Sequence, residues 1–447
     1  MVTSNKDHRL IFLCILISGL LCVGHVTVSR LIVTLSIALY LGCIVWTSMK
    51  GKVLYFLCFF IPWAPLMKFE PGTMSFYTIG LIGACLLTWI WHRMSTKTYI
   101  VPAMALIMML FAVRMYYGYG IDNSFIMFCI MLLLIPIVGL DMHRTCDFYH
   151  LNLFYSVGII IAALSAYYLV RYPSIAGFID VYSWNEITRY SGYYEDANFY
   201  SAQIAAALAG LLVIMITFRK RMLESIVLSV VLLYCGLLSA SKAFVITAVI
   251  VVLLWILQVL SLRGNMSYKV TVIMGIAIIA IGIIASNAFE SVFKVIAIRF
   301  SNNENVSDLT TGRSDTWLNY IDYWESSPGS LLFGKGYTSV IVGRYSTHNT
   351  IFQSVFQFGL VGLPFFIVWL VKLFQITMRK IKIKQSHYLL CLILVLGVAL
   401  PWMGIDLLFF DEFFLMMFYI SLGFKWICDH SNELFVVDEN VRTAQDM

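Results

Sequence analysis

Several cationic side chains and one histidine fall in polar segments that separate long apolar stretches of the sequence. The cations there that could bind a phosphate group are Arg189, Lys242, Arg299, Arg313 and Arg344. A guanidinium matches phosphate oxygens with a fixed two-pronged array of donors, and the imidazole of His348 can exchange a proton near neutral pH. These residue types predict a site that binds an anionic group, such as a diphosphate, beside a proton acceptor.

Three carboxylates, Asp196, Asp406 and Asp411, are further candidates. Asp196 and Asp406 are candidates for orienting His348 or an arginine. We count Asp196 among the catalytic candidates, together with His348 and Arg313. Asp411 lies beside apolar residues, where a carboxylate needs a partner or water. The alternative for Asp196 is internal pairing with the cations of the outer loops. For Asp406 and Asp411 it is exposure to water at the outer mouth.

Aromatic side chains accompany the charges. Trp317, Tyr320 and Trp324 recur at helical spacing, and indole and phenol rings can stack on the apolar face of a sugar. Tyr337 and Asn349 are further candidates for sugar binding. The alternative is that the rings only anchor their segment at a membrane surface, and that Asn349 caps the helix that follows it.

The composition shows what must position these groups. Of 447 residues, 61% are hydrophobic and only 12% are charged, whereas a water-soluble fold carries about a quarter charged residues. This excludes a cytosolic enzyme, a secreted module and a disordered chain, and it predicts an all-α polytopic membrane protein. The net charge of +6 is small and the basic residues are spread along the chain, so no nucleic-acid partner is indicated. The 10 cysteines lie almost all in apolar runs, which argues against a metal site or a disulfide framework.

A bilayer core of about 30 Å needs roughly 20 apolar residues per helix. On that basis the sequence predicts about fourteen spans, at residues 10–25, 29–48, 53–67, 74–91, 99–117, 124–140, 149–170, 198–217, 223–239, 243–261, 269–286, 349–375, 386–403 and 407–427. The third is short and contains Pro62 and Pro65, which suggests a re-entrant segment.

An even number of spans puts both termini on one side. Most Lys and Arg residues of the connecting loops then share that side, which the positive-inside rule makes cytoplasmic. The candidate site falls on the outer face, in two long loops. The chain thus divides into N-terminal spans at 1–170, a first outer loop at 171–197, central spans at 198–286, a large outer loop at 287–348, C-terminal spans at 349–428 and a cytoplasmic tail at 429–447.

The large outer loop has predicted helices of its own. Residues 287–300 and 314–326 carry aromatic and apolar side chains at helical spacing, which predicts two amphipathic helices on the membrane surface. Ser314 is the expected N-cap of the second helix, and Pro328 is expected to end it.

Four short segments form an ordered series. The first, residues 189–198, reads Arg-Tyr-Ser-Gly-Tyr-Tyr-Glu-Asp-Ala-Asn, and the second, 239–242, reads Ser-Ala-Ser-Lys. The third, 312–337, holds Gly-Arg-Ser, then a Trp and then Leu-Phe-Gly-Lys-Gly-Tyr. The fourth, 348–362, begins with His-Asn and ends with Gly-Leu-Val-Gly.

In this order, with a large outer loop before the His-Asn pair, the segments resemble the bacterial O-antigen polymerase and O-antigen ligase superfamily. The His-Asn segment is the most specific of the four. Two positions depart from the family pattern. Ala197 replaces a proline, and Lys242 stands where an arginine is usual, which keeps the charge but loses the fork. The resemblance covers residues 185–365 closely and the whole chain in topology.

The resemblance implies a GT-C-like, inverting glycosyltransferase that needs no metal or other cofactor. Its donor would be a glycan on undecaprenyl diphosphate. A polymerase, the function we expect, passes the growing chain to a lipid-linked repeat unit, whereas a ligase passes a finished chain to a lipid A-core or wall acceptor. Arg189, Lys242 and Arg313 would hold the diphosphate, and His348 would orient or deprotonate the attacking hydroxyl. Membrane lipids, a chain-length regulator and a flippase are the implied partners.

A transporter, such as a flippase for the lipid-linked unit, is the alternative from another class. A flippase should carry charged residues along a path through its spans. We assign to the flanking loops the cations that lie at the ends of predicted spans, Arg30, Lys269, Lys372 and Lys425. This leaves Arg114 as the one Lys or Arg placed inside a span. A membrane scaffold without chemistry would not need arginine-rich outer loops. The sequence therefore favours an active site at the outer surface over a conduit.

Overall fold

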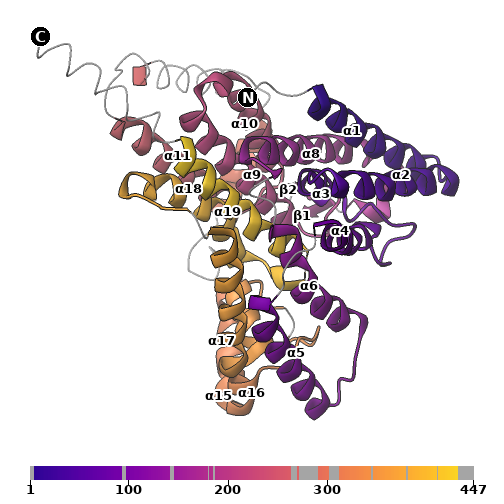
Figure 1. Ribbon diagram of the computed structural model, residues 1–447, viewed down its shortest axis with the longest axis vertical. Coiled ribbons are helices and arrows are strands. Elements are labelled where there is room, and N and C mark those ends of the chain that lie inside the picture. The colour runs from indigo at the N-terminus through magenta and orange to yellow at the C-terminus, as the bar shows by residue number, and fades with distance from the viewer. Residues whose placement is uncertain are drawn as a thin grey trace, which may run out of the picture.

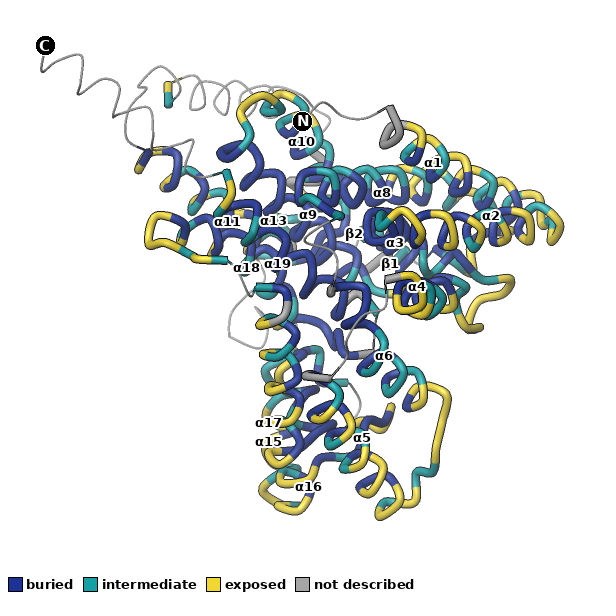
Figure 2. Tube along the Cα trace, viewed as in Figure 1, coloured by how far each residue is buried: buried dark blue, intermediate teal, exposed yellow. Residues whose placement is uncertain are grey.

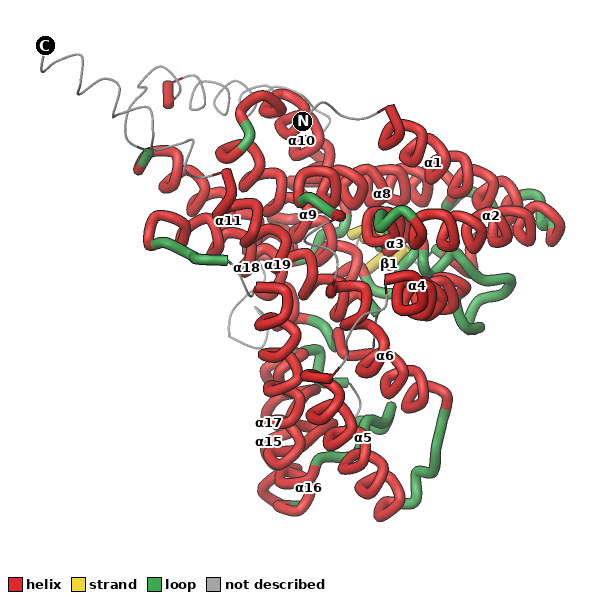
Figure 3. Tube along the Cα trace, in the orientation of Figure 1, coloured by secondary structure: helices red, strands yellow, loops and turns green. Residues whose placement is uncertain are grey.

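The computed structural model describes residues 5–92, 97–140, 145–179, 181–184, 187–262, 269–270, 290–301, 312–343, 346–378, 381–409 and 411–430. Helices dominate this part of the chain, and a single short hairpin accompanies them (Figure 3). Figure 1 shows a broad group of helices that includes α1, α2, α3 and α8, and an arm formed by α5, α15, α16 and α17.

In the N-terminal half, α2 packs on both α1 and α4. The bounds are α1 Asn5–Val26, α2 Arg30–Met49, α3 Val53–Phe60, α4 Phe76–His92, α5 Lys97–Tyr117, α6 Asn123–Leu140 and α8 Phe148–Leu169. Short 3-10 turns follow α3 and α8, at η1 Ile61–Trp63 and η2 Pro173–Phe178.

The second half contains the elements that carry the candidate residues. The hairpin strands are β1 Val181–Trp184 and β2 Ile187–Tyr190. The helices are α9 Ala197–Thr217, α10 Met222–Leu238, α11 Lys242–Ser261, α13 Glu290–Ser301, α15 Arg313–Ser326, α16 Pro328–Phe333, α17 Thr350–Met378, α18 Tyr388–Ala399 and α19 Glu412–His430. The 3-10 turns are η3 Arg219–Arg221, η5 Gln385–His387, η6 Leu400–Gly404 and η7 Leu407–Phe409.

Helix α9 is the centre of the fold. It contacts α8, α10, α11 and α18, and it is buried along nearly its whole length (Figure 2). Small residues let its neighbours approach closely, as is usual between helices in membranes. A Cβ on Gly397 of α18 would lie only 2.2 Å from the Cβ of Ala209. Because α9 is fixed from all sides, its first turn is a rigid platform for the residues around Asp196.

The helices confirm a helical polytopic membrane protein. Within the described residues, nine helices are long and apolar enough to cross a membrane, at Arg9–Val26, Arg30–Met49, Tyr99–Tyr117, Phe148–Leu169, Ala197–Thr217, Arg219–Leu238, Lys242–Ser261, Thr350–Gln375 and Gln385–Gly404. Shorter apolar helices cover Val53–Trp63, Phe76–Trp91 and Asn123–Gly139. The span predicted at 269–286 lies almost entirely outside the described residues.

The short third segment has a simple physical cause. Every residue of α3 is buried, and its end passes into η1, where Pro62 occupies one of the first two positions. Proline has no backbone N–H to continue the helical ladder. Helix α3, with 8 residues, is too short to cross a bilayer core, which takes about 20 residues.

The two loops that the sequence predicts to be outer differ from expectation in two ways. Helices form in both of the predicted segments, as α13 and α15, and their place on a membrane surface stays a prediction. The predicted N-cap Ser314 is wrong, because Gly312 is the N-cap, with a left-handed φ of 77° that turns the chain into the helix. Pro328 follows the end of α15, as predicted, and also begins α16. The β1–β2 hairpin, which pairs Tyr182 with Arg189, was not predicted.

The glycines of the third and fourth motifs join a loop to a kinked helix. Helix α17 breaks at Gly359, whose φ is 66° and ψ 175°. The break frees carbonyl groups of the preceding turn. Lys335 donates its backbone N–H to the Phe356 carbonyl at 2.8 Å, and Gly336 donates to that of Gln357 at 3.0 Å. These glycines therefore build the scaffold beside the site and do not themselves supply chemistry.

Candidate functional site

The candidate residues meet where several helices begin or end. Asp196 caps the start of α9, Ser239 follows the end of α10, and Lys242 begins α11. Arg313 begins α15 and His348 lies just before α17. We call Arg189, Asp196, Asn198, Lys242, Arg313, His348 and Asp406 the cationic cluster.

Arg189 is fixed by two contacts to neighbouring helix ends. It lies on β2, which the hairpin holds against the start of α9. Its Nε donates to the Ser239 carbonyl at 3.1 Å, and its Nη2 lies 3.4 Å from Asn198 Oδ1. The Ser239 carbonyl lies at the end of α10, where a helix leaves its last carbonyl groups without an intrahelical partner. Asn198 lies in the first turn of α9. The hairpin thus brings a cation to the corner between α9 and α10.

Asn198 is the hub of this corner. Its Oδ1 accepts from Ser241 Oγ at 2.9 Å, as well as from Arg189. Its Nδ2 donates to Asp196 Oδ1 at 2.8 Å, and its backbone N–H donates to the same oxygen at 2.7 Å. An amide side chain has both an acceptor oxygen and a donor nitrogen, so it can accept from a cation and donate to a carboxylate at once.

Lys242 follows directly on this network. Ser241, which is bonded to Asn198, is the N-cap of α11, and its Oγ accepts from the backbone N–H of Phe244 at 3.4 Å. The Lys242 ammonium lies 5.8 Å from the centre of the Phe300 ring on α13. The position of Lys242 is therefore set by the same hub that holds Arg189.

Arg313 is half-buried, and its guanidinium has no hydrogen bond or ion pair to any residue in the described part of the chain. Burial lowers the pKa of Arg313, and the positive charge of Arg189 lowers it further. The negative charges of Asp196 and Asp406 raise this pKa and so oppose the effect of burial. Arg313 also lies against the turn before Asp406, since a Cβ on Gly404 would be 2.8 Å from Arg313 Nη1. Electrostatics thus place Arg313 among both carboxylates and a second arginine.

Arg114 shows how the same side chain looks when its role is structural. It is fully buried, and its Nε donates to the Gly120 carbonyl at 2.7 Å while its Nη2 pairs with Asp122 Oδ2 at 2.6 Å. Its Nη1 donates to the Tyr337 carbonyl. Arg114 clamps the loop after α16 to α5, whereas Arg313 makes none of these bonds.

The turn before α17 is pinned by Asp406. Thr347 Oγ1 donates to Asp406 Oδ1, and the backbone N–H groups of His348 and Asn349 donate to the same carboxylate at 3.1 and 3.2 Å. His348 has a left-handed φ of 43°, a conformation that costs a non-glycine residue about 1–2 kcal/mol. The three bonds hold it there.

The His348 side chain itself is half-buried and forms no hydrogen bond or ion pair with the described residues. A strained backbone held by a buried carboxylate, with an imidazole left without a protein partner, is the arrangement expected of a group that meets a ligand. The cationic cluster therefore combines fixed positive charge with a proton acceptor.

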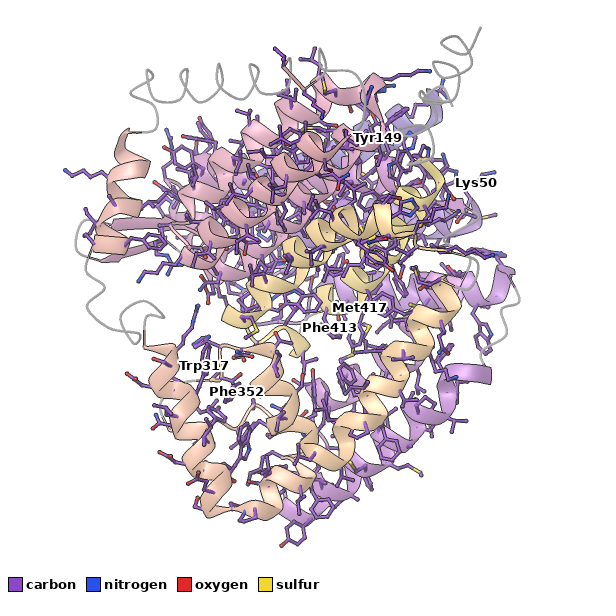
Figure 4. All side chains as sticks on the ribbon, turned by 90° about the vertical axis from the view of Figure 1, so that its left-hand side faces the viewer. Lys50, Tyr149, Trp317, Phe352, Phe413 and Met417 are labelled. Carbon is purple, nitrogen blue, oxygen red and sulfur yellow. The ribbon has the colours of Figure 1, made fainter. Side chains whose placement is uncertain are left out.

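The aromatic candidates divide into two kinds. Trp317 and Trp324 both stack on the Phe352 ring, with centroids 5.8 and 5.6 Å from its centroid. Figure 4 shows Trp317 and Phe352 close together, on α15 and α17. Trp317 Nε1 donates to the Thr347 carbonyl at 2.9 Å, so this indole lies directly beside the His348 turn. Both tryptophans keep part of their surface exposed.

Tyr320 and Tyr337 have rings that are covered by protein. Tyr320 is 1% exposed and its oxygen accepts from the Val342 backbone N–H at 3.2 Å. The Tyr337 ring stacks on Phe128 with centroids 4.0 Å apart, and its hydroxyl donates to the Leu408 carbonyl at 3.2 Å. Neither ring is therefore accessible for a sugar to stack on, because protein side chains cover both.

The remaining candidates are placed as follows. Asn349 caps α17, because its Oδ1 accepts from the backbone N–H groups of Ile351 and Phe352 at 2.9 and 3.2 Å. Asp411 accepts from Thr78 on α4 at 2.7 Å, and within the described residues no contact joins it to the cationic cluster. The side chain of Arg299 and all of Arg344 lie outside the described residues.

Sequence reasoning missed two members of this network as site residues. Asn198 belongs to the first motif, and Thr347 immediately precedes the His-Asn pair. The motifs could therefore have identified both residues. No protein-family model matches the sequence, and no curated protein matches it.

Proposed function

We propose that this protein is a polysaccharide polymerase of the cytoplasmic membrane. In this proposal it transfers a growing glycan from undecaprenyl diphosphate to a lipid-linked repeat unit at the outer face. It does so as an inverting glycosyltransferase that uses no metal. The resemblance of the four motifs suggests this function, and the convergence of residues from all four motifs on one cluster supports it.

The observation that carries the proposal is Arg313. Withdrawing a guanidinium from water is costly unless it is paired and hydrogen-bonded, yet the half-buried Arg313 makes no hydrogen bond with the described residues. Its position beside Arg189 leaves a cationic pair that an anion can bridge. A diphosphate presents oxygens that match the guanidinium fork, so it would supply the bonds that the protein does not.

The charge balance suits a diphosphate. Arg189, Lys242 and Arg313 supply positive charge, and Asp196 and Asp406 offset only part of it. The hydrogen bonds of Asn198 hold Arg189 and Asp196 in place before any ligand arrives, and those of Asp406 hold the His348 turn. Catalysis by preorganised charge requires this kind of fixed geometry, because charge that need not reorganise stabilises the transition state most.

The reaction would run as a single displacement. The acceptor hydroxyl oxygen attacks the anomeric carbon from the side opposite the diphosphate. The new glycosidic bond forms as the bond to the diphosphate oxygen breaks, and undecaprenyl diphosphate leaves with the electron pair. His348 accepts the hydroxyl proton on a ring nitrogen, while the cations neutralise charge on the leaving group. Attack from the opposite side inverts the anomeric centre.

A ligase that passes finished glycan to a lipid A-core or wall acceptor uses the same motifs and the same cluster, so it remains the alternative within this enzyme class. A flippase is less well supported. Its transport path would need available charge within the spans, whereas Arg114 is committed to Asp122 and to backbone carbonyls.

The test is gene disruption followed by complementation. Cells without a polymerase should attach single repeat units to the acceptor, cells without a ligase should accumulate long chains on undecaprenyl diphosphate, and cells without a flippase should lack both products at the outer face.

Wild-type protein should restore long chains, and His348→Ala at equal membrane level should not. Arg30→Ala is the control, because Arg30 is exposed and pairs only at the surface with Glu70. Full-length chains from His348→Ala would remove His348 from the mechanism.

A further inference from the structure

A cavity of about 230 Å³ lies at the ends of α8, α9 and α19 opposite to the cationic cluster. It opens where α8 begins, where α9 passes into η3 and where α19 ends. Figure 4 shows Tyr149, which lines this cavity, far from Trp317. The residues that matter here are Asp147, Tyr149, Phe218, Arg221, Lys425 and Trp426.

The floor of the cavity is aromatic. The Tyr149 and Phe218 rings meet edge to face with centroids 5.5 Å apart, and those of Phe218 and Trp426 are 5.8 Å apart. Tyr149 and Trp426 are buried. Three candidate spans, Phe148–Leu169, Ala197–Thr217 and Arg219–Leu238, all end or begin here. Tyr and Trp gather at the level where a helix leaves the hydrocarbon, so this floor lies at the boundary between acyl chains and headgroups.

The rim of the cavity carries cations. Arg221 and Lys425 line it, and Arg219 and Lys220 precede Arg221 on the exposed turn η3. The Arg221 guanidinium lies 5.9 Å from the centre of the Tyr149 ring. A guanidinium has five N–H donors and an ammonium has three, so both groups can bind a phosphate alongside protein neighbours.

The carboxylates near the rim are largely committed to other groups. Asp147 pairs with His150 Nδ1 at 2.6 Å and accepts from Tyr55 Oη at 3.2 Å. Glu224 pairs with Arg221 at 3.2 Å and accepts from Tyr149 Oη at 2.9 Å. His430 stacks on Trp426, with centroids 3.7 Å apart. Asp429 is exposed at the edge. Four cations, Arg219, Lys220, Arg221 and Lys425, thus lie in or next to the rim against three carboxylates, Asp147, Glu224 and Asp429, of which Glu224 is paired with Arg221.

We propose that this cavity binds the phosphodiester headgroup of an anionic phospholipid. The phosphate would lie against Arg221 and Lys425, and the start of the acyl chains would lie over the aromatic floor. Basic pockets between membrane helices have the charge and depth that such headgroups require. The occupant is a lipid and not a soluble phosphate, because the cavity joins an apolar floor to a cationic rim at the level of the bilayer surface.

The test uses the full-length protein in neutral detergent. Phosphatidylglycerol should raise its thermal midpoint, whereas phosphatidylcholine should not. Arg221→Gln and Lys425→Gln should each weaken the apparent affinity for phosphatidylglycerol about tenfold, since each removes one charge-assisted contact. Arg221→Lys should keep most of the response because it keeps the positive charge. This variant still tests the role of the charge if Arg221→Gln folds poorly.

Lys372→Gln is the matched control. Lys372 is exposed, contacts Gln375 and does not line the cavity, so its variant should respond to phosphatidylglycerol like the wild type. An equal response in all variants would mean that the lipid adsorbs without using the cavity, and the proposal would be wrong. An equal midpoint shift from soluble glycerol phosphate would likewise overturn it in favour of a free-anion site.

Discussion

The carboxylate of Asp406 accepts the backbone N–H of His348 at 3.1 Å, across 58 residues of sequence. The contact fixes the backbone of the candidate base and leaves its imidazole without a partner among the described residues. It also sets a negative charge near Arg313, whose pKa it helps to raise against the effect of burial. One carboxylate thus bonds to the backbone of the proposed proton acceptor and interacts through its charge with the proposed anion-binding group.

Replacing Asp406 by Asn should slow glycan transfer while the protein still folds. The amide keeps one oxygen acceptor but loses the charge and at least one of the bonds to the 347–349 turn. A bond to a buried charged group is worth about 1.5–3 kcal/mol, so the rate should fall about 10- to 100-fold. The rate per folded protein, measured with purified lipid-linked repeat units, checks this. Glu70→Gln, at an exposed surface pair, should have wild-type activity, and equal rates in both variants would refute the positioning role.

Replacing Arg313 tests diphosphate binding directly. Arg313→Ala should raise the inhibition constant of a soluble prenyl diphosphate by about tenfold or more, because it removes a charge-assisted, two-pronged contact. The inhibition constant of Arg313→Lys should lie between those of the wild type and Arg313→Ala, because lysine keeps the charge but lacks the two-pronged array of donors. Inhibition constants from competition assays at fixed donor concentration report both effects. If Ala and Lys retained wild-type affinity, the anion would bind elsewhere.

Asn198 should act through Arg189 and not only through stability. Asn198→Ala and Arg189→Ala should be non-additive in their effect on transfer rate, with a coupling of about 0.5–3 kcal/mol, as is usual for directly bonded residues. Asn198→Asp should be worse than Ala, because a second carboxylate would face Asp196. The double-mutant cycle is measured at matched folded protein.

Asn152 provides the control for that cycle. It is also a fully buried asparagine, and its Oδ1 accepts from Tyr419 Oη at 2.6 Å in the core. Asn152→Ala should lower stability but show no coupling to Arg189→Ala. Additive effects for both asparagines would reduce Asn198 to a packing residue.

The kink of α17 should depend on Gly359. An alanine there would have to adopt a φ of 66°, and its Cβ would lie 2.3 Å from the backbone nitrogen of Gly334. Strain in the left-handed region costs about 1–2 kcal/mol before the clash is counted, so Gly359→Ala should lower the thermal midpoint and the folded yield. Gly329→Ala, where an added Cβ meets nothing within 4 Å, should change the midpoint little. Size-exclusion profiles and thermal unfolding in detergent measure both.

The sequence by itself determined the class of fold and the chemical character of the site. Composition and apolar run length depend on the solvent that each residue must face, so they predict membrane helices without knowledge of packing. Local periodicity predicted α13 and α15, and residue type singled out Arg189, Arg313 and His348. These properties are local, which is why a single sequence carries them.

Only the tertiary structure decided which of these residues work together. The bonds of Asp406 to His348, of Asn198 to Ser241 and of Arg189 to Ser239 join segments far apart in sequence, and no periodicity encodes them. The same holds for the burial of Tyr320 and Tyr337, which depends on partners such as Phe128 and Phe356 from other helices. The difference between Arg114 and Arg313 is of this kind too. Whether a guanidinium is bonded to protein acceptors, as Arg114 is, or lacks such bonds among the described residues, as Arg313 does, depends on the acceptors that the fold places around it.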